Sequence, residues 1–228
     1  MQLVLIAFFI LPLLGFILSL AFKNHEEKAI SGVAIATSGI HMIFTIGLFV
    51  FWLTQGSPIF NSNLLTIYHS EEFNFGFDLF YDRTTAVYSI VTSIIIFIVS
   101  IFSKTYMHRE SGFKRFYNHF LLFNVGINLL IIAGNFETLF LGWEIVGITS
   151  FLLIAFYRDR YLPVRNAMKV LSFYRLGDVA LILAIWFCHH LFHTNIKFFT
   201  LGDSPLLYDA THHHPVQGIL ISLLFIIA

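Results

Sequence analysis

Four ionisable side chains fall within segments of this sequence that are otherwise apolar enough to be embedded in lipid: Glu144, Lys169, Arg175 and Asp178. A charge at the centre of a membrane helix costs about 2.5–3.5 kcal/mol, so such groups persist mainly where they face a protein interior or a water-filled path. Glu144 stands in the middle of the run LFLGWEIVGITSFLLIAFY, residues 139–157. Burial favours a protonated carboxylate, whereas a nearby cation favours the ionised form. Glu144 is therefore a candidate for the switchable acid of a proton relay; the alternative is a neutral, hydrogen-bonded structural glutamate.

The other three charges lie on the next apolar segment, residues 165–193. Arg175 and Asp178 are three residues apart and share one face of a helix. They form either a pair that tunes the relay or a static ion pair that only fixes packing. Lys169 lies nearer the start of the segment, where its long side chain can extend to the membrane surface. It can also serve as the cation that tunes Glu144.

The composition indicates that lipid is the main surrounding of this chain. Of its 228 residues, 57% are hydrophobic and 11% charged, and Phe occurs 28 times. A soluble domain carries about 25% charged residues and needs a large polar surface. The formal net charge is zero, which gives no argument for a nucleic-acid partner. The single cysteine, Cys188, excludes an internal disulfide and a cysteine-based metal site.

The elements that must position the four charges are membrane helices, each needing about 20 apolar residues. Gly142 and Gly147 flank Glu144 and predict the close approach of another helix. A seventh apolar run begins near Pro215 and reaches Ala228 without a stop signal, so we expect the protein to continue. We predict an all-α polytopic membrane protein with six complete transmembrane helices and the start of a seventh. The six are 2–22, 29–54, 85–103, 115–134, 136–157 and 165–193.

The distribution of charge between the loops predicts the orientation. Cytoplasmic loops of membrane proteins carry an excess of Lys and Arg. Alternate loops hold nine basic residues, whereas the loops on the other side hold only Arg83 and Lys197. We expect an extracytoplasmic N-terminus and three cytoplasmic basic loops. The nine are Lys23, Lys28, Lys104, Arg109, Lys114, Arg115, Arg158, Arg160 and Arg165.

Two longer connections lie on the side opposite the basic loops. Within residues 55–84, the alternation of polar and aromatic residues over 70–77 predicts a strand, with 64–68 as its partner in a hairpin. Around the second connection, histidines gather. A metal site there would need fixed geometry and support from neighbouring residues, so we predict no bound metal and no cofactor. The histidines concerned are His189, His190, His193, His212, His213 and His214.

Beyond about residue 80, the sequence resembles the antiporter-like membrane subunits of respiratory complex I, most of all the L subunit, called subunit 5 in mitochondria. The resemblance rests on the run FYNHFLLF at 116–123, the block LGWEIVG at 141–147, the run AMK at 167–169 and the block RLGD at 175–178. The large subunit of Mrp-type sodium/proton antiporters and the membrane subunit of inorganic-carbon uptake complexes are similar.

This resemblance implies the first part of a fold of about fourteen helices, built from two inverted repeats that each contain a broken helix. It implies that Glu144 is the glutamate of a gating pair whose lysine follows Ala228, and that Lys169, Arg175 and Asp178 complete the relay. Asp82 matches an acidic position at the start of the third helix. Residues 1–84 would form two helices and an extracytoplasmic loop, and residues 85–228 the first part of the proton-channel repeat.

The resemblance also implies a function: translocation of protons, or of sodium ions, as a non-redox subunit of a complex such as NADH:quinone oxidoreductase in the inner membrane. Its partners would be other membrane subunits. Phe173-Tyr174 and His189-His190 favour less typical branches, including the inorganic-carbon uptake type, where the partner would be a zinc-bearing soluble protein. An alternative from another class is a structural membrane scaffold with static ion pairs.

Overall fold

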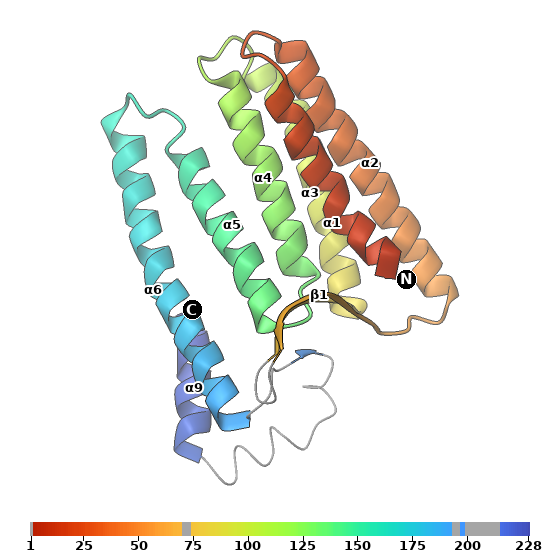
Figure 1. Ribbon diagram of the computed structural model, residues 1–228. Coiled ribbons are helices and arrows are strands. Elements are labelled where there is room, and N and C mark those ends of the chain that lie inside the picture. Colours follow the sequence, from red (N-terminus) through yellow and green to blue (C-terminus); the bar gives the residue numbers. More distant parts are fainter. Residues whose placement is uncertain (1, 70–73, 193–196, 199–214) are drawn as a thin grey trace.

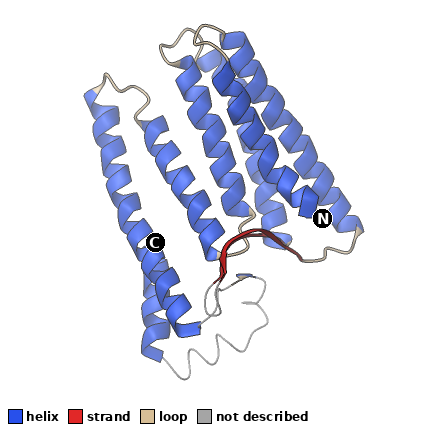
Figure 2. Ribbon diagram, viewed as in Figure 1, coloured by secondary structure: helices blue, strands red, loops and turns tan. Residues whose placement is uncertain are grey.

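The protein is a bundle of long helices with one β-hairpin at its end. The computed structural model describes residues 2–69, 74–192, 197–198 and 215–228 (Figure 1). Helix dominates these residues, and strand is confined to one hairpin (Figure 2). The helices are α1 (Gln2–Ala21), α2 (Glu27–Thr54), α3 (Arg83–Tyr106), α4 (Phe113–Ile131), α5 (Phe136–Ile154), α6 (Tyr161–Phe192) and α9 (Pro215–Ile227).

Five of these helices are long and apolar enough to cross a membrane: α1, α2, α3, α5 and α6. The sequence predicts a sixth span at 115–134, and α4 does form there. However, α4, although its 19 residues match the length of α5, falls outside this group by composition because it carries polar residues along its length, namely Asn118, His119, Asn124 and Asn128. The helix nevertheless lies inside the bundle, packed against α1 and α5. Of the six predicted spans, five are thus confirmed as helices that could cross a membrane, and the sixth is confirmed as a helix only.

The helix boundaries differ from the predicted spans mainly at their polar ends. Helix α6 begins at Tyr161 rather than at 165, so that Tyr161 and Pro163 form its first turn instead of a loop. Proline is tolerated there because the amide groups of a first turn have no partner within the helix. Helix α3 begins at Arg83 because Asp82 caps it: the Asp82 carboxylate accepts a hydrogen bond from the Thr85 amide at 2.8 Å.

The predicted hairpin is confirmed, although residues 70–73 of its predicted second strand lie outside the described residues. Strands β1 (Phe60–His69) and β2 (Asn74–Tyr81) pair antiparallel, from Phe60 opposite Tyr81 to His69 opposite Asn74. The three loops with the basic residues lie at the opposite end of the bundle, at the top of Figure 1. Hence the charge asymmetry read from the sequence separates two real ends of the molecule.

The apolar core divides into two clusters along the bundle axis. The basic-end cluster gathers around Tyr117 and the hairpin-end cluster around Tyr81. The basic-end cluster consists of Ile30, Ala34, Ile96, Met107, Phe113, Tyr117, Phe120, Leu121 and Phe156. The hairpin-end cluster consists of Leu5, Phe8, Leu48, Trp52, Leu79, Tyr81, Ala86 and Ile132. Many large apolar side chains point outward, as lipid-facing surfaces require, including Leu3, Ile43 and Phe102.

Candidate functional site

Close packing between α4 and α5 holds the helix that carries Glu144. A Cβ atom on Gly142 would lie 2.6 Å from the backbone nitrogen of Leu130, so only glycine permits this approach. Gly126 on α4 makes a similar approach to Ile145. The close contact predicted from Gly142 is therefore confirmed, as is usual for small residues between membrane helices. The same prediction for Gly147 is wrong, because nothing lies within 4 Å of a Cβ built there.

The carboxylate of Glu144 is bound by Arg175 on the neighbouring helix α6. The Arg175 Nη1 atom donates to Glu144 Oε1 at 3.1 Å and to Oε2 at 3.0 Å. The same nitrogen lies 3.0 Å from Asp178 Oδ2, so the two α6 residues pair on one helix face as predicted. One guanidinium thus bridges two carboxylates from different helices.

A fourth side chain completes the cluster. Trp143, which precedes Glu144 on α5, donates its indole N–H to Asp178 Oδ1 at 2.9 Å. The two oxygens of Asp178 therefore have different partners, a neutral donor and a cation. Trp143 and Arg175 together fix the position of the Asp178 carboxylate.

Burial within the cluster is graded. The side chain of Asp178 is 8% exposed, that of Glu144 20% and that of Arg175 50%. The three formal charges sum to −1, since two carboxylates share one cation. Each carboxylate of the cluster therefore depends on the same guanidinium for its counter-charge.

Lys169 lies apart from this cluster. Its side chain is exposed on α6, and among the described residues it makes no ion pair with Glu144. The cation that contacts Glu144 is therefore Arg175, whereas the sequence predicts Lys169 as a candidate for this role. Of the four predicted site residues, the structure thus joins three and leaves the fourth nearer the basic-loop end of α6.

Glu144 also lines a cavity of about 310 Å³ between α5, α6 and the hairpin. The cavity contains a second carboxylate from α5, that of Glu137. Glu137 and Glu144 are seven positions apart in the sequence, which places them two turns apart on one helix face. The remaining lining is apolar: Phe75, Phe77, Phe140, Leu141, Ile182 and Ile185. This cavity connects the level of Glu144 with the hairpin end of α5.

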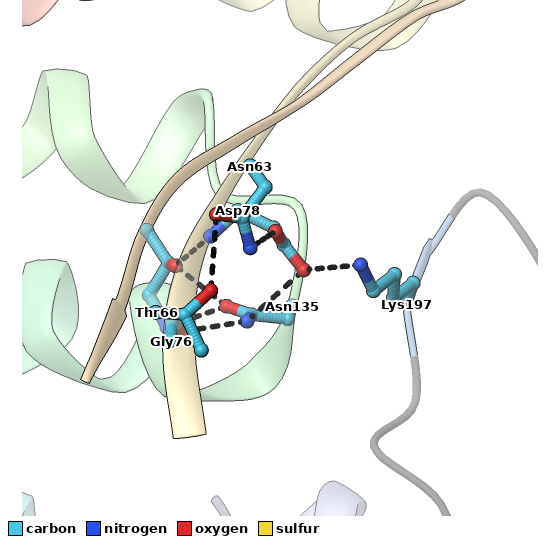
Figure 3. A network of polar contacts seen from close by, with 7 residues as sticks. Asn63, Thr66, Gly76, Asp78, Asn135 and Lys197 are labelled. Atoms are coloured by element: carbon cyan, nitrogen blue, oxygen red, sulfur yellow. Dashed lines mark hydrogen bonds and ion pairs between the residues drawn. The ribbon is translucent and has the colours of Figure 1, made fainter. Parts of the chain in front are cut away.

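At the hairpin end, Asp78 of β2 joins three segments through one buried carboxylate (Figure 3). Asn63 donates to Asp78 Oδ1 at 2.8 Å, and Lys197 lies 3.2 Å from Oδ2. Asn135, the residue that caps α5, donates to the Gly76 carbonyl at 2.8 Å. The network therefore fixes the hairpin against the start of the helix that carries Glu144.

The histidines give no metal centre in the described part of the chain. His189 and His190 lie in the last turn of α6, and His190 stacks on Trp186 with ring centroids 5.6 Å apart. No group of three or more potential ligands gathers among the described residues. His193, His212, His213 and His214 lie outside those residues.

Sequence reasoning missed three contributors to the site: Trp143, Glu137 and Asp78. Two of them carried a usable signal. Trp143 is adjacent to the acid, and Glu137 follows the same helix face two turns away. The sequence held no signal for the contacts of Asp78, because the hairpin, the start of α5 and the segment of Lys197, which meet at Asp78, are far apart in sequence.

Comparison with known proteins locates the chain among membrane subunits of respiratory complexes. Residues 133–228 match the family described as NADH:quinone oxidoreductase/Mrp antiporter, TM, and residues 67–117 match NADH-Ubiquinone oxidoreductase (complex I), chain 5 N-terminus. NADH-quinone oxidoreductase subunit L of Escherichia coli (strain K12) is 32% identical over 79% of this chain and 30% of the relative. NADH-ubiquinone oxidoreductase chain 5 of Marchantia polymorpha is 32% identical over 64% of this chain and 22% of the relative.

A solved structure shares the fold. The membrane-bound sulfane sulfur reductase, an archaeal respiratory membrane complex, includes a chain that matches with a TM-score of 0.78 at 17% identity. The match covers 100% of this chain and 44% of that one. The chain spans about a third or less of the length of the two relatives and 44% of the chain in the solved structure.

Proposed function

Because this chain belongs to the antiporter-like membrane subunits of the complex I L-subunit type, we propose that it translocates protons as one subunit of a larger energy-coupling complex. One observation carries the proposal: a single guanidinium, that of Arg175, is shared between Glu144 on α5 and Asp178 on α6. A shared cation gives two acids whose affinities for a proton depend on its position.

The mechanism follows from this competition. While Arg175 contacts Glu144 closely, the ionised form of Glu144 is stabilised. When Arg175 shifts toward Asp178, Glu144 loses its counter-charge within a largely apolar setting and binds a proton. When Arg175 returns, the proton is released. Trp143 holds Asp178 throughout, so that the guanidinium moves between two fixed carboxylates.

The proposed proton path continues through one ionisable residue on each side of the cluster of Glu144, Arg175 and Asp178. Glu137 lies two turns closer to the hairpin in the cavity that Glu144 also lines. Lys169 lies nearer the basic-loop end of α6, where its long side chain can extend to the membrane surface. We assign the hairpin end to the extracytoplasmic side and the basic loops to the cytoplasmic side of the inner membrane, following the asymmetry of Lys and Arg.

Partner subunits would supply the energy, because a relay of this kind carries charge and performs no redox reaction of its own. On this view residues 85–228 form the first part of the channel repeat and residues 1–84 its flanking helices. Sodium transport and inorganic-carbon uptake remain predictions. Co-purification of quinone-reducing subunits would favour an NADH:quinone oxidoreductase. Co-purification of a zinc-bearing soluble protein would favour the inorganic-carbon uptake type.

The test is Glu144→Gln in the full-length protein within its assembled complex. Glutamine keeps the size and hydrogen-bonding groups of the side chain but cannot take up or release a proton. We expect a loss of proton-coupled activity of at least roughly tenfold, equivalent to about 1.4 kcal/mol. Glu110→Gln in the loop after α3 is the matched control and should retain activity.

Wild-type activity of Glu144→Gln in an assembled complex would overturn the relay and favour a scaffold with static ion pairs. Assembly is checked by native gel electrophoresis. The measurement is the rate of proton uptake into reconstituted vesicles.

A further inference from the structure

A buried polar layer separates the two apolar clusters of the α1–α4 bundle, away from the site on α5 and α6. Between the clusters, the buried side chains of α2, α3 and α4 include hydroxyl, imidazole and carboxamide groups. Polar groups buried at this depth of a membrane helix bundle cost free energy unless they find partners. We call this set the polar layer: His41, Thr45, Ser89, Ser93, Asn124 and Asn128.

Contacts at one level fix the register of the layer. Ser38 and Ser100 are hydrogen-bonded at 2.8 Å, and the Tyr117 hydroxyl donates to the Ser100 carbonyl at 3.1 Å. Helices α2 and α4 run toward the hairpin from this level, and α3 runs away from the hairpin. Two turns nearer the hairpin, about 10 Å along the axis, the corresponding residues are Thr45, Ser93 and Asn124.

All three hydroxyls of the layer already donate a hydrogen bond. Thr45 donates to the His41 carbonyl, Ser93 to the Ile90 carbonyl and Ser89 to the Ala86 carbonyl, each within its own helix. Such hydroxyls retain only acceptor capacity toward their surroundings. They can therefore accept a hydrogen bond from a further group in the layer.

The two asparagines leave a complementary donor and acceptor. Asn128 Nδ2 donates to the Asn124 carbonyl and to Asn124 Oδ1, both at 2.7 Å. Among the described residues, Asn124 Nδ2 and Asn128 Oδ1 have no partner, although the two residues are 0% and 1% exposed. Buried polar atoms of this kind are nearly always satisfied, by protein or by bound water.

We infer that the polar layer is an internal water-binding site in which at least one water molecule bridges Asn124 Nδ2 and Asn128 Oδ1. A water accepts from the first and donates to the second, and its other hydrogen can reach a serine or threonine oxygen. This satisfies both amides and gives the water about three hydrogen bonds, the number usual for buried water.

The chemistry of the layer favours water over a metal cation. In the described chain, the buried acidic side chains are Asp78 and Asp178, neither of which belongs to α1–α4. A buried cation without a carboxylate partner is strongly disfavoured in low dielectric. A neutral ligand that both donates and accepts hydrogen bonds fits the donor and acceptor present.

The test is a structure of the assembled complex at a resolution that shows ordered water. We expect density within hydrogen-bonding distance, about 2.7–3.2 Å, of both Asn124 Nδ2 and Asn128 Oδ1. Absence of this density where equally buried waters are visible elsewhere, or a protein group in its place, would overturn the inference. The wild-type map alone decides this.

A variant sharpens the assignment. Asn128→Leu removes the acceptor and should remove the density. The matched control is Asn118→Leu on the same helix, where Asn118 accepts a hydrogen bond from Ser19 outside the layer. Density that survives Asn128→Leu unchanged would contradict the bridging role. These readouts do not depend on whether the α5–α6 cluster carries protons.

Discussion

The α5–α6 cluster and the polar layer of α1–α4 place polar chemistry in the membrane in opposite ways. The cluster consists of charges that are graded in exposure, from the buried Asp178 to the half-exposed Arg175. The layer consists of neutral groups that are fully buried. The difference follows from solvation. An enclosed charge needs an opposite charge nearby, whereas enclosed neutral groups can satisfy one another or be satisfied by water. Charge lies where it can be paired, and neutral polarity where it must be enclosed.

The largest effect is expected from replacing the cation of the cluster, Arg175. Arg175→Gln leaves Glu144 and Asp178 without their shared counter-charge, so at least one carboxylate should remain protonated. We expect proton translocation to fall roughly tenfold or more, and Arg175→Lys to restore part of it because it returns the charge without the planar fork. Vesicle proton uptake measures both variants.

Arg165→Gln is the control for that experiment. Arg165 lies near the start of α6, where it stacks on Tyr161 at 5.8 Å, outside the cluster. Equal losses in Arg165→Gln and Arg175→Gln would show that general basicity of α6, and not the bridge, supports the activity.

The next effect concerns the indole that holds Asp178. Trp143→Phe keeps the ring but removes the N–H donor, and a hydrogen bond to a charged group contributes about 1.5–3 kcal/mol. We expect the rate of proton transfer to fall, since Asp178 loses the donor that holds its carboxylate in place. Trp186→Phe on the exposed side of α6 is the control. An unchanged rate for Trp143→Phe would mean that the indole only packs.

The close contact between α4 and α5, which joins the two regions, can be tested with one substitution at each of two glycines of α5. Gly142→Ala inserts a methyl group where the Leu130 backbone lies 2.6 Å away, so we expect destabilisation by about 1–3 kcal/mol. Gly147→Ala on the same helix faces open space and should change stability by less than about 0.5 kcal/mol. Thermal unfolding in detergent measures both. Equal shifts would mean that α4 and α5 are less closely packed than described.

The smallest effect is expected within the neutral layer. Ser93→Ala removes a hydroxyl whose proton is used on its own helix carbonyl. We expect stability to change by less than about 1 kcal/mol and proton translocation to stay at the wild-type rate. Initial rates of vesicle acidification, compared with the Arg175 variants, test this. A loss of translocation comparable to that of Arg175→Gln would abolish the distinction between the two regions.

Much of the fold was predictable because lipid imposes strong rules on sequence. Spans must be about 20 apolar residues long, and polar loops must alternate sides, so five helices and the two ends of the bundle follow from pattern alone. Helix α4 shows the limit. Its asparagines lower its hydropathy, yet they face the protein interior, and hydropathy does not distinguish a lipid-facing residue from an enclosed one.

The sequence by itself determined which acids and bases lie in the membrane and that Arg175 and Asp178 share a helix face, because spacing along one helix sets which residues are neighbours. Only the tertiary structure decided that Arg175 and not Lys169 reaches Glu144, that Trp143 holds Asp178, and that Asn124 faces Asn128 within an enclosed layer. The physical reason is that contacts between helices depend on rotation and depth. Those are set by close approaches such as that of Gly142 to Leu130, which couple residues far apart in the chain.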